Sequence, residues 1–186
     1  MVRILLEREE VNPDNPDNHG WTPLTYAASS GHEGVVKILL KREEVNPDKP
    51  DRLGRAPLSH AASCAYEEVV KILLEQEEVN PDKPDNHGWT PLTHAALSGH
   101  EEVVKILLKW EDVDPDKPDN YGWTPLTFAA WKGHEGVVKI LLKRKEVNPD
   151  RPDLICRTPL WLATEYGHER VAVLLRSRKA AIPSTI

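Results

Sequence analysis

Residues 17–40 read DNHGWTPLTYAASSGHEGVVKILL, and this stretch contains the start and stop signals of two short helices. Thr22 is a typical N-cap residue, and Pro23 suits the first helical position because it needs no N–H partner there. Gly31 is typical of a helix end. The apolar run at 35–40 gives a second helix a stripe broad enough for burial on more than one side. The stretch therefore predicts a pair of packed helices.

The stretch returns every 34 residues, with no insertion between its copies. Its central triplet recurs as Thr22-Pro23-Leu24, Ala56-Pro57-Leu58, Thr90-Pro91-Leu92, Thr124-Pro125-Leu126 and Thr158-Pro159-Leu160. We divide the chain into a partial N-terminal repeat at 1–17, units at 18–51, 52–85, 86–119 and 120–153, and a C-terminal capping unit at 154–186. Helices of about ten residues are not stable alone, so the units must stabilise one another by stacking.

The pattern D-x-x-G-x-T-P-L-x-x-A-A-x-x-G-H-x-x-V-V-x-x-L-L, complete at 85–108, resembles the ankyrin repeat family over practically the whole chain. A tetratricopeptide array would instead show an early tryptophan followed by Leu-Gly. The resemblance implies an all-α repeat solenoid of stacked helix-turn-helix units with finger loops between them. The very similar neighbouring units also resemble the arrays of fungal immune-receptor-like proteins.

The loop segment at 46–51, Asn-Pro-Asp-Lys-Pro-Asp, is longer than the equivalent segment in the ankyrin family. Because proline fixes its own backbone angle, we interpret the two prolines as stiffening a long spacer between units. Pro47 and Pro50 also form a P-x-x-P motif, a possible ligand for domains with aromatic grooves.

In the ankyrin family, the fingers and the exposed side of each first helix line a concave surface that binds proteins. The resemblance therefore implies a non-catalytic protein-protein interaction scaffold or recognition array, as part of a larger protein. It assigns partner binding to His19, Trp21, Leu53, Arg55, His87, Trp89, Leu97, Tyr121, Trp123, Trp131 and Lys132. Tryptophan and arginine are frequent anchors of protein interfaces, which agrees with this assignment.

The tryptophans also allow two other interpretations. Trp21, Trp89 and Trp123 occupy one repeat position, so their indoles can pack against the neighbouring finger and serve only the fold. If their ring faces are exposed and parallel, the row can instead stack against a glycan or another small molecule. Binding of a protein partner stays the first hypothesis, and binding of a small molecule or glycan is the alternative.

The composition disfavours several other classes of partner. The net charge of −6 would repel a phosphate backbone, so we expect no nucleic-acid partner. No apolar run reaches the roughly 18 residues of a membrane-spanning helix. Cys64 and Cys156 lie in distant units, and we expect both to be free thiols. Two cysteines make no disulfide framework, which favours a reducing compartment, the cytoplasm or the nucleus.

The sequence shows no constellation typical of an enzyme, so we expect neither catalysis nor a cofactor. We expect no metal site either, because the histidines at 32, 100, 134 and 168 share one repeat position. Neighbouring helices lie about 8–10 Å apart, whereas zinc holds each ligand at about 2 Å. We expect His60 and His94 to line the concave side singly. The asparagines of the E-V-N runs resemble sites of asparaginyl hydroxylases, but they also suit simple turns.

Two parts of the array depart from the common pattern. In the divergent unit at 52–85, Ala56 replaces the capping threonine and Ala65 replaces the helix-ending glycine, so we expect weaker stability there. The partial repeat at 1–17 lacks a first helix, so Val2 and Leu5 should be incompletely covered. We therefore expect residues 1–10 either to fray or to be shielded by a neighbouring molecule, the latter through self-association of this partial repeat.

Overall fold

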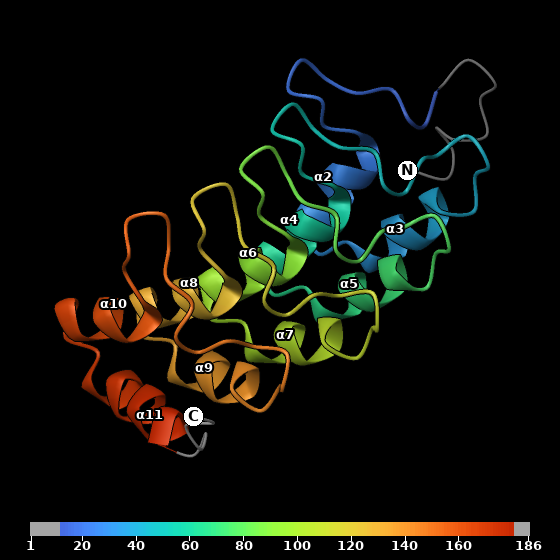
Figure 1. Cartoon of the computed structure of the whole chain (residues 1–186). Helices are drawn as coiled ribbons and strands as arrows, with labels where there is room; N and C mark the ends of the chain where they lie inside the picture. Colours follow the sequence, from blue (N-terminus) through green and yellow to red (C-terminus); the bar gives the residue numbers. More distant parts are fainter. Residues whose placement is uncertain (1–11, 181–186) are drawn as a thin grey trace.

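The computed structural model describes residues 12–180 of the chain. Ten α-helices and no β-strand lie in this range. The helices, labelled in Figure 1, are α2 (Pro23–Ser29), α3 (Glu33–Leu39), α4 (Pro57–Ser63), α5 (Glu67–Leu74), α6 (Pro91–Ser98), α7 (Glu101–Leu107), α8 (Pro125–Lys132), α9 (Glu135–Leu141), α10 (Pro159–Glu165) and α11 (Glu169–Ala180). None of them is long and apolar enough to span a lipid bilayer.

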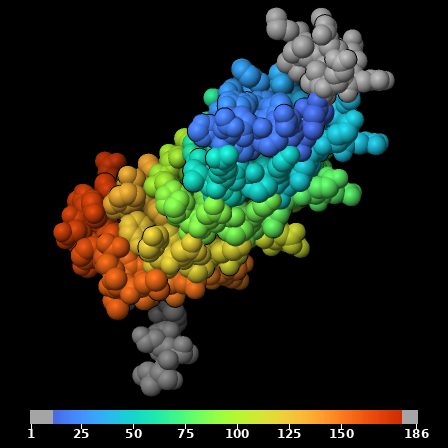
Figure 2. Space-filling view, turned by 90° about the horizontal axis from the view of Figure 1, so that it is seen from above, coloured from blue at the N-terminus to red at the C-terminus, as the bar shows by residue number. Residues whose placement is uncertain are grey.

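The helices form two rows (Figure 1). The inner helices α2, α4, α6, α8 and α10 pack against one another in sequence order. The outer helices α3, α5, α7, α9 and α11 form the second row, and each packs against the inner helix of its own pair. Figure 2 shows the successive pairs as layers of an elongated body. The predicted all-α repeat solenoid is confirmed.

The inner helices begin as their sequence predicts. Thr22 caps α2, because its side-chain oxygen accepts the N–H of Thr25 at 3.1 Å, and the two hydroxyls lie 3.0 Å apart. The same contacts recur in Thr90 with Thr93 and in Thr124 with Thr127. Helix α4 starts at Ala56, which has no side chain that can cap it. Its Ser59 hydroxyl is buried and has no hydrogen-bond partner among the described residues.

One continuous apolar core joins the pairs. The leucine of each triplet is at most 1% exposed in α2, α4, α6 and α8. Each outer helix adds fully buried side chains, such as Val36 in α3 and Val138 in α9. Fully burying a leucine contributes about 1.5–3 kcal/mol relative to leaving it in water. The small Ala27 and Ala28 keep the inner helices close, so each pair covers the apolar face of the next.

The Pro-rich turns connect the units by ion pairs as well as spacing them. Asn46 accepts the N–H of Asp48 through its side chain at 2.9 Å, which forms a local turn, and Pro47 is buried. Lys49 then reaches back one unit, where its Nζ lies 2.8 Å from both the carbonyl and the carboxylate of Asp14. The same pairing joins Lys83 to Asp48, Lys117 to Asp82 and Arg151 to Asp116. We call these four pairs the turn ladder.

Within residues 12–180, two residues other than glycine adopt the left-handed backbone conformation. Ala65 has φ 61° at the end of α4, and Cys156 has φ 66° in the last loop before α10. Glycines occupy the equivalent positions in the other units, and this conformation costs an ordinary residue roughly 1–2 kcal/mol. Cys156 and Cys64 are both exposed and unpaired, as predicted.

The last helix of the array differs in length from the others. Helix α11 has 12 residues, whereas the other helices have seven or eight, and its exposed side carries Arg176 and Ser177. A terminal repeat needs such a polar outer face, so the capping role stays our prediction. The expectations for residues 1–11, including self-association through the partial repeat, lie outside the described residues.

Candidate functional site

The loops before the inner helices contain tight hairpins, each held by one aspartate. We call residues 17–21, 51–55, 85–89, 119–123 and 153–157 the fingers. In one finger, Asp119 Oδ1 accepts the N–H groups of Tyr121 and Trp123, both at 2.8 Å. The first aspartate of every other finger makes the same two bonds. The finger side chains are therefore held in place by the chain's own backbone.

Backbone hydrogen bonds also join each finger to the next. The N–H of Arg52 donates to His19 O, Asn86 to Leu53 O, Asn120 to His87 O and Leu154 to Tyr121 O, at 2.9–3.1 Å. Two asparagine side chains add bonds between fingers, from Asn86 to Arg52 O and from Asn120 to Asn86 O. The fingers therefore form one continuous row beside the inner helices (Figure 1).

The second oxygen of each finger aspartate binds a side chain that differs from unit to unit. Asp51 and Asp85 lie 3.0 and 3.1 Å from the Nε2 atoms of His60 and His94. Both histidines are buried, so the expectation that they line the concave side singly is wrong. The rings face inward because a buried finger carboxylate there requires a hydrogen-bond partner.

These contacts shift the protonation equilibria of the groups. Burial, with a smaller contribution from the nearby Arg55 guanidinium, lowers the pKa of His60 although Asp51 opposes this shift. Burial opposes ionisation of Asp85, but hydrogen bonds from His94 and from the Trp89 and His87 amides hold its pKa below the usual range. The carboxylate of Asp85 therefore ionises more readily than that of a free aspartate.

A second set of histidines connects the units. Nε2 of His134, the residue before α9, lies 2.9 Å from the carbonyl oxygen of Leu97 at the end of α6. His100 and His168 make the equivalent contact with the carbonyls of Ser63 and Trp131. These rings bridge neighbouring units one at a time. Across residues 12–180, no group of three or more potential metal ligands lies together.

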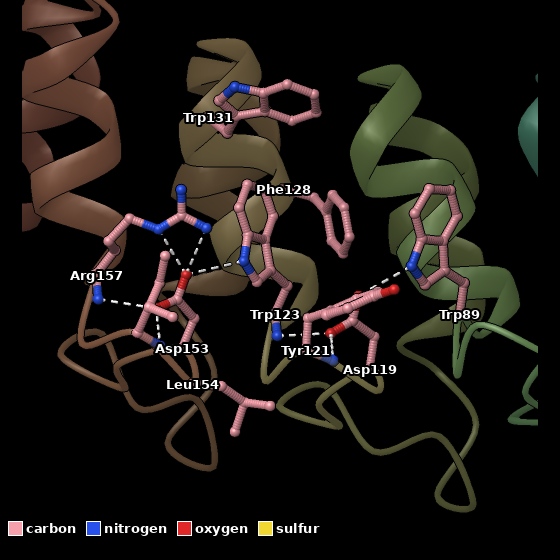
Figure 3. Close-up of a pocket in the computed structure, with 10 residues that line it drawn as sticks. Trp89, Asp119, Tyr121, Trp123, Phe128, Trp131, Asp153, Leu154 and Arg157 are labelled. Atoms are coloured by element: carbon pink, nitrogen blue, oxygen red, sulfur yellow. Dashed lines mark hydrogen bonds and ion pairs between the residues drawn. The ribbon is translucent and has the colours of Figure 1, made fainter.

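An apolar hollow of about 360 Å³ lies between the last two fingers and α8 (Figure 3). We call it the C-terminal hollow. Its lining residues are Trp89, Asp119, Tyr121, Trp123, Phe128, Trp131, Asp153, Leu154, Ile155 and Arg157. Three of them are largely exposed at the finger tips, namely Tyr121 at 65%, Leu154 at 73% and Ile155 at 68%. Such exposed apolar side chains around a hollow are typical of a binding site.

The rings of the C-terminal hollow contact one another in a series. Phe128 lies between Trp89 and Trp123, with ring centroids 5.0 Å from each, and Trp131 meets Trp123 edge to face at 5.5 Å. The indole N–H groups also connect fingers, because Trp89 donates to Asp119 and Trp123 donates to Asp153, both at 3.0 Å. These contacts fix the aromatic wall.

Two cationic side chains border the C-terminal hollow. Arg157 stands beside Trp123, with its guanidinium carbon 5.3 Å from the ring centroid, and its Nε donates to Asp153 at 2.8 Å (Figure 3). Lys132 is exposed, and its Nζ lies 3.8 Å from the Trp131 ring centroid. Among the residues that the structure describes, Lys132 forms no ion pair.

A second hollow, of about 550 Å³, lies between the first two fingers. We call it the N-terminal hollow, and it is lined by His19, Trp21, Tyr26, Asp51, Arg52, Leu53 and Arg55. The ring centroid of Trp21 lies 5.0 Å from that of Tyr26 and 4.6 Å from that of His60, which it meets edge to face. The Tyr26 hydroxyl donates to Asp17 at 2.7 Å, so this wall ends in polar groups.

The predicted partner-binding residues fall into two groups and three separate positions. The N-terminal hollow contains His19, Trp21, Leu53 and Arg55, and the C-terminal hollow contains Trp89, Tyr121, Trp123 and Trp131. Lys132 borders the C-terminal hollow. His87 contacts Trp89, and their ring centroids are 5.9 Å apart. Leu97 is half-buried and lies in neither hollow.

The rings of Tyr26 and Phe128 were not among the predicted site residues. Both lie three residues after the prolines at the starts of α2 and α8, at the position that His60 and His94 occupy in their units. An aromatic or imidazole ring recurs there in four successive units, and this recurrence was the signal that could have identified them. The sequence shows Asp119 and Asp153 as a repeated aspartate, but it does not show that both line the C-terminal hollow.

The stacked helix pairs and the finger row define a helical repeat protein. Residues 1–51, 41–119, 77–153 and 111–185 match the family model described as ankyrin repeats in three copies. The chain belongs to the ankyrin repeat family. Ankyrin repeats are generally protein-protein interaction modules, and the family is typically non-enzymatic. No curated protein matches the sequence.

Proposed function

We propose that this chain is a non-catalytic recognition array that binds a protein partner along its finger row. The C-terminal hollow carries the proposal, because it joins exposed apolar finger tips to a fixed aromatic wall. Tyrosine, tryptophan and arginine dominate the energetics of many protein interfaces, and all three types line this hollow. The two free cysteines favour the cytoplasm or the nucleus as the compartment.

The preformed surface supports partner binding in a second way. Asp119, Asp153 and the backbone bonds between fingers hold the wall in place in the free chain. Binding to a preorganised surface avoids part of the entropy cost of ordering side chains at an interface. The array is therefore suited to a partner segment that itself loses freedom on binding.

Binding of a glycan is the alternative, and the ring geometry favours it less. A stacking platform for sugars needs exposed, parallel ring faces along the row. Instead the indoles of the row are only half-exposed, and neighbouring rings contact them at steep angles, 62° for His60 on Trp21 and 80° for Trp131 on Trp123. A small apolar molecule fits the C-terminal hollow better, because about 360 Å³ lies at the small end of ligand-binding pockets.

A peptide-display selection against the folded chain tests the proposal. Binders are selected from random peptides, and their affinity is measured for a finger-tip variant that combines Leu53→Ser and Tyr121→Ser. The control is Trp110→Ser, which removes a 39% exposed tryptophan from the turn after α7. We expect the finger-tip variant to lose affinity at least about tenfold while the control binds normally, as for interface anchors. Binders that depend on Trp110, or a failure to select any binder, would overturn the proposal.

A further inference from the structure

We infer that the occupant of the C-terminal hollow is an acidic peptide segment that inserts one bulky aromatic or aliphatic side chain. This inference rests on the proposed function and names the chemistry of the partner. It depends on three features: the apolar wall, the carboxylates that are already bound, and the cations at the border.

The wall selects an apolar anchor. Phe128 is 4% exposed and lies between Trp89 and Trp123, so the floor of the hollow offers ring carbons to an entering group. The indole N–H groups of Trp89 and Trp123 already donate to aspartates and cannot also bind a polar group of the partner. A polar side chain placed against the ring floor would lose its water without gaining a hydrogen bond there. An aromatic or aliphatic side chain gains about 25 cal/mol for each Å² of apolar surface that it buries.

The two carboxylates of the hollow are not available to a cationic partner. Asp153 is 1% exposed at its side chain, and it accepts bonds from Trp123, Arg157 and two backbone amides. Asp119 is saturated in the same way by Trp89 and by two amides of its own finger. Both negative charges are therefore satisfied inside the protein.

The positive groups remain at the surface. Arg157 keeps about 30% of its side chain exposed, and Lys132 is exposed without an ionic partner among the described residues. Each cation already lies over an indole ring, so a second cation from a ligand would be repelled from the same ring faces. A carboxylate next to the anchor residue would instead pair with Lys132.

Local charges decide where an acidic segment can bind, because the negative net charge of the chain repels it at long range. The net charge is −6, and the first turns of the outer helices carry acidic residues, such as Glu101, Glu102 and Glu135. Near the two hollows the cations are Arg52, Arg55, Arg157 and Lys132, whereas the finger aspartates beside them already accept hydrogen bonds inside the protein. An acidic segment would therefore be repelled from the outer row and attracted to the fingers.

Three short synthetic peptides, each with a fluorescent label, test the inference on the full chain. The first is rich in glutamate with one central tryptophan. The second has alanine in place of that tryptophan, and the third has lysines in place of the glutamates. We expect the first to bind and the other two to bind at least about tenfold more weakly. Added salt should weaken the first complex, because exposed charge pairs are screened.

The repeat supplies matched variants of the protein. Trp131→Ser and Lys132→Ser introduce the residues that the first unit carries at the same positions, Ser29 and Ser30, so the fold accommodates them. Each should weaken binding of the glutamate-tryptophan peptide severalfold or more. The control combines Lys109→Ser with Trp110→Ser, which removes the same two residue types from the turn after α7 and should leave binding unchanged.

Each remaining outcome decides against part of the inference. Equal binding of the alanine peptide removes the apolar anchor, and equal binding of the lysine peptide removes the charge assignment. If no synthetic peptide binds but display-selected binders still depend on Leu53 and Tyr121, the inference fails and the proposed function stands. If those binders are independent of the fingers as well, both fail.

Discussion

The two hollows occupy the same place in the repeat, three periods apart, and differ in a few side chains. His19, Tyr26, Ser29 and Arg52 in the N-terminal part correspond to Tyr121, Phe128, Trp131 and Leu154 in the C-terminal part. Each of these changes removes a polar group or adds apolar surface. The backbone scaffold is the same in both, because both are formed by adjacent fingers with identical aspartate bonds.

Side chains at equivalent positions, and not the shared backbone, therefore decide the polarity of each hollow. In the first finger pair, Trp21 contacts the imidazole of His60, and the Tyr26 hydroxyl donates to Asp17. In the last finger pair, the ring equivalent to Tyr26 is Phe128, which has no polar group. The indole N–H of Trp89 donates to the Asp119 carboxylate instead. A single ring position therefore decides whether the carboxylate binds a neighbouring ring of its own unit or the tryptophan of the unit before.

The largest predicted effect concerns the aspartate below each hollow. Asp153→Ala leaves an indole N–H, a guanidinium and two amides without their acceptor, so we expect it to destabilise the array by about 3 kcal/mol. Asp51→Ala leaves fewer side-chain donors and should cost about 2 kcal/mol. Urea denaturation of both variants measures the difference. Equal losses would show that Trp123 does not depend on its carboxylate.

Asp82, an aspartate of the turn ladder, provides the control for the Asp153 and Asp51 variants. Burial raises the pKa of Asp82, and the bonds from Lys117 only partly offset the cost of its charge. Asp82→Asn removes that buried charge as well as the ion pair, so the net change in unfolding free energy should stay below about 1 kcal/mol.

The next effect concerns the fourth residue of each finger, which is Gly54 beside the N-terminal hollow and Cys156 beside the C-terminal hollow. Gly54 has φ +81°, and a Cβ there would lie 2.8 Å from the backbone nitrogen of Asn86 in the next finger. We expect Gly54→Ala to destabilise the array by about 2 kcal/mol through strain and collision. Cys156 occupies the same position in the last described finger, so Cys156→Gly should stabilise the array by about 1 kcal/mol. Thermal denaturation against Cys64→Ser, expected to be neutral, checks both signs.

A smaller effect is expected at the start of α4, below the N-terminal hollow. Ala56→Thr introduces a hydroxyl that can accept the Ser59 N–H and pair with the buried Ser59 hydroxyl, and it should stabilise the array by about 1 kcal/mol. Thr90→Ala is the reverse change in the next unit and should cost a similar amount. Hydrogen exchange should show weaker protection of α4 than of α6 in the wild-type chain, and equal protection would contradict the reasoning.

The smallest effect is a pH dependence confined to the N-terminal hollow. Burial and Arg55 lower the pKa of His60, so the unfolded chain binds its proton more readily than the folded chain. This contribution to stability is complete above the unfolded value of about 6.5 and is lost as the pH falls below it. His60→Phe copies the arrangement around Phe128 and should reduce the loss of stability between about pH 7.5 and pH 5.5. An unchanged loss would assign the titration to other groups.

The sequence predicts the fold well because the signals are local and repeated. Thr22 and Pro23 define a helix start without reference to any distant residue, and the period copies that start along the chain. The rings of Trp89 and Trp123 were assigned to the concave surface by repeat position, and the structure brings both to one hollow.

Other contacts could not be predicted, because they depend on how one unit is placed against the next. The pairing of Lys49 with Asp14 spans 35 residues, one more than the period, and Trp89 reaches Asp119 across 30 residues. These offsets follow from the rotation and translation between units, which cannot be deduced from the spacing of residues in the sequence. His60 was misplaced for the same reason, since only the folded finger shows that Asp51 faces its ring.

The turn ladder has a consequence for how such an array can change its length over evolution. The units at 18–51, 52–85 and 86–119 each supply a lysine to the unit before and an aspartate to the unit after, as Lys83 and Asp82 do in adjacent positions. A duplicated unit would therefore bring both halves of its connections and would restore every pairing at its two new borders. Gene duplication can lengthen the protein without any compensating substitution, and deletion of one whole unit can shorten it in the same way. The hollows can then diverge one at a time on a scaffold whose copy number is free to vary.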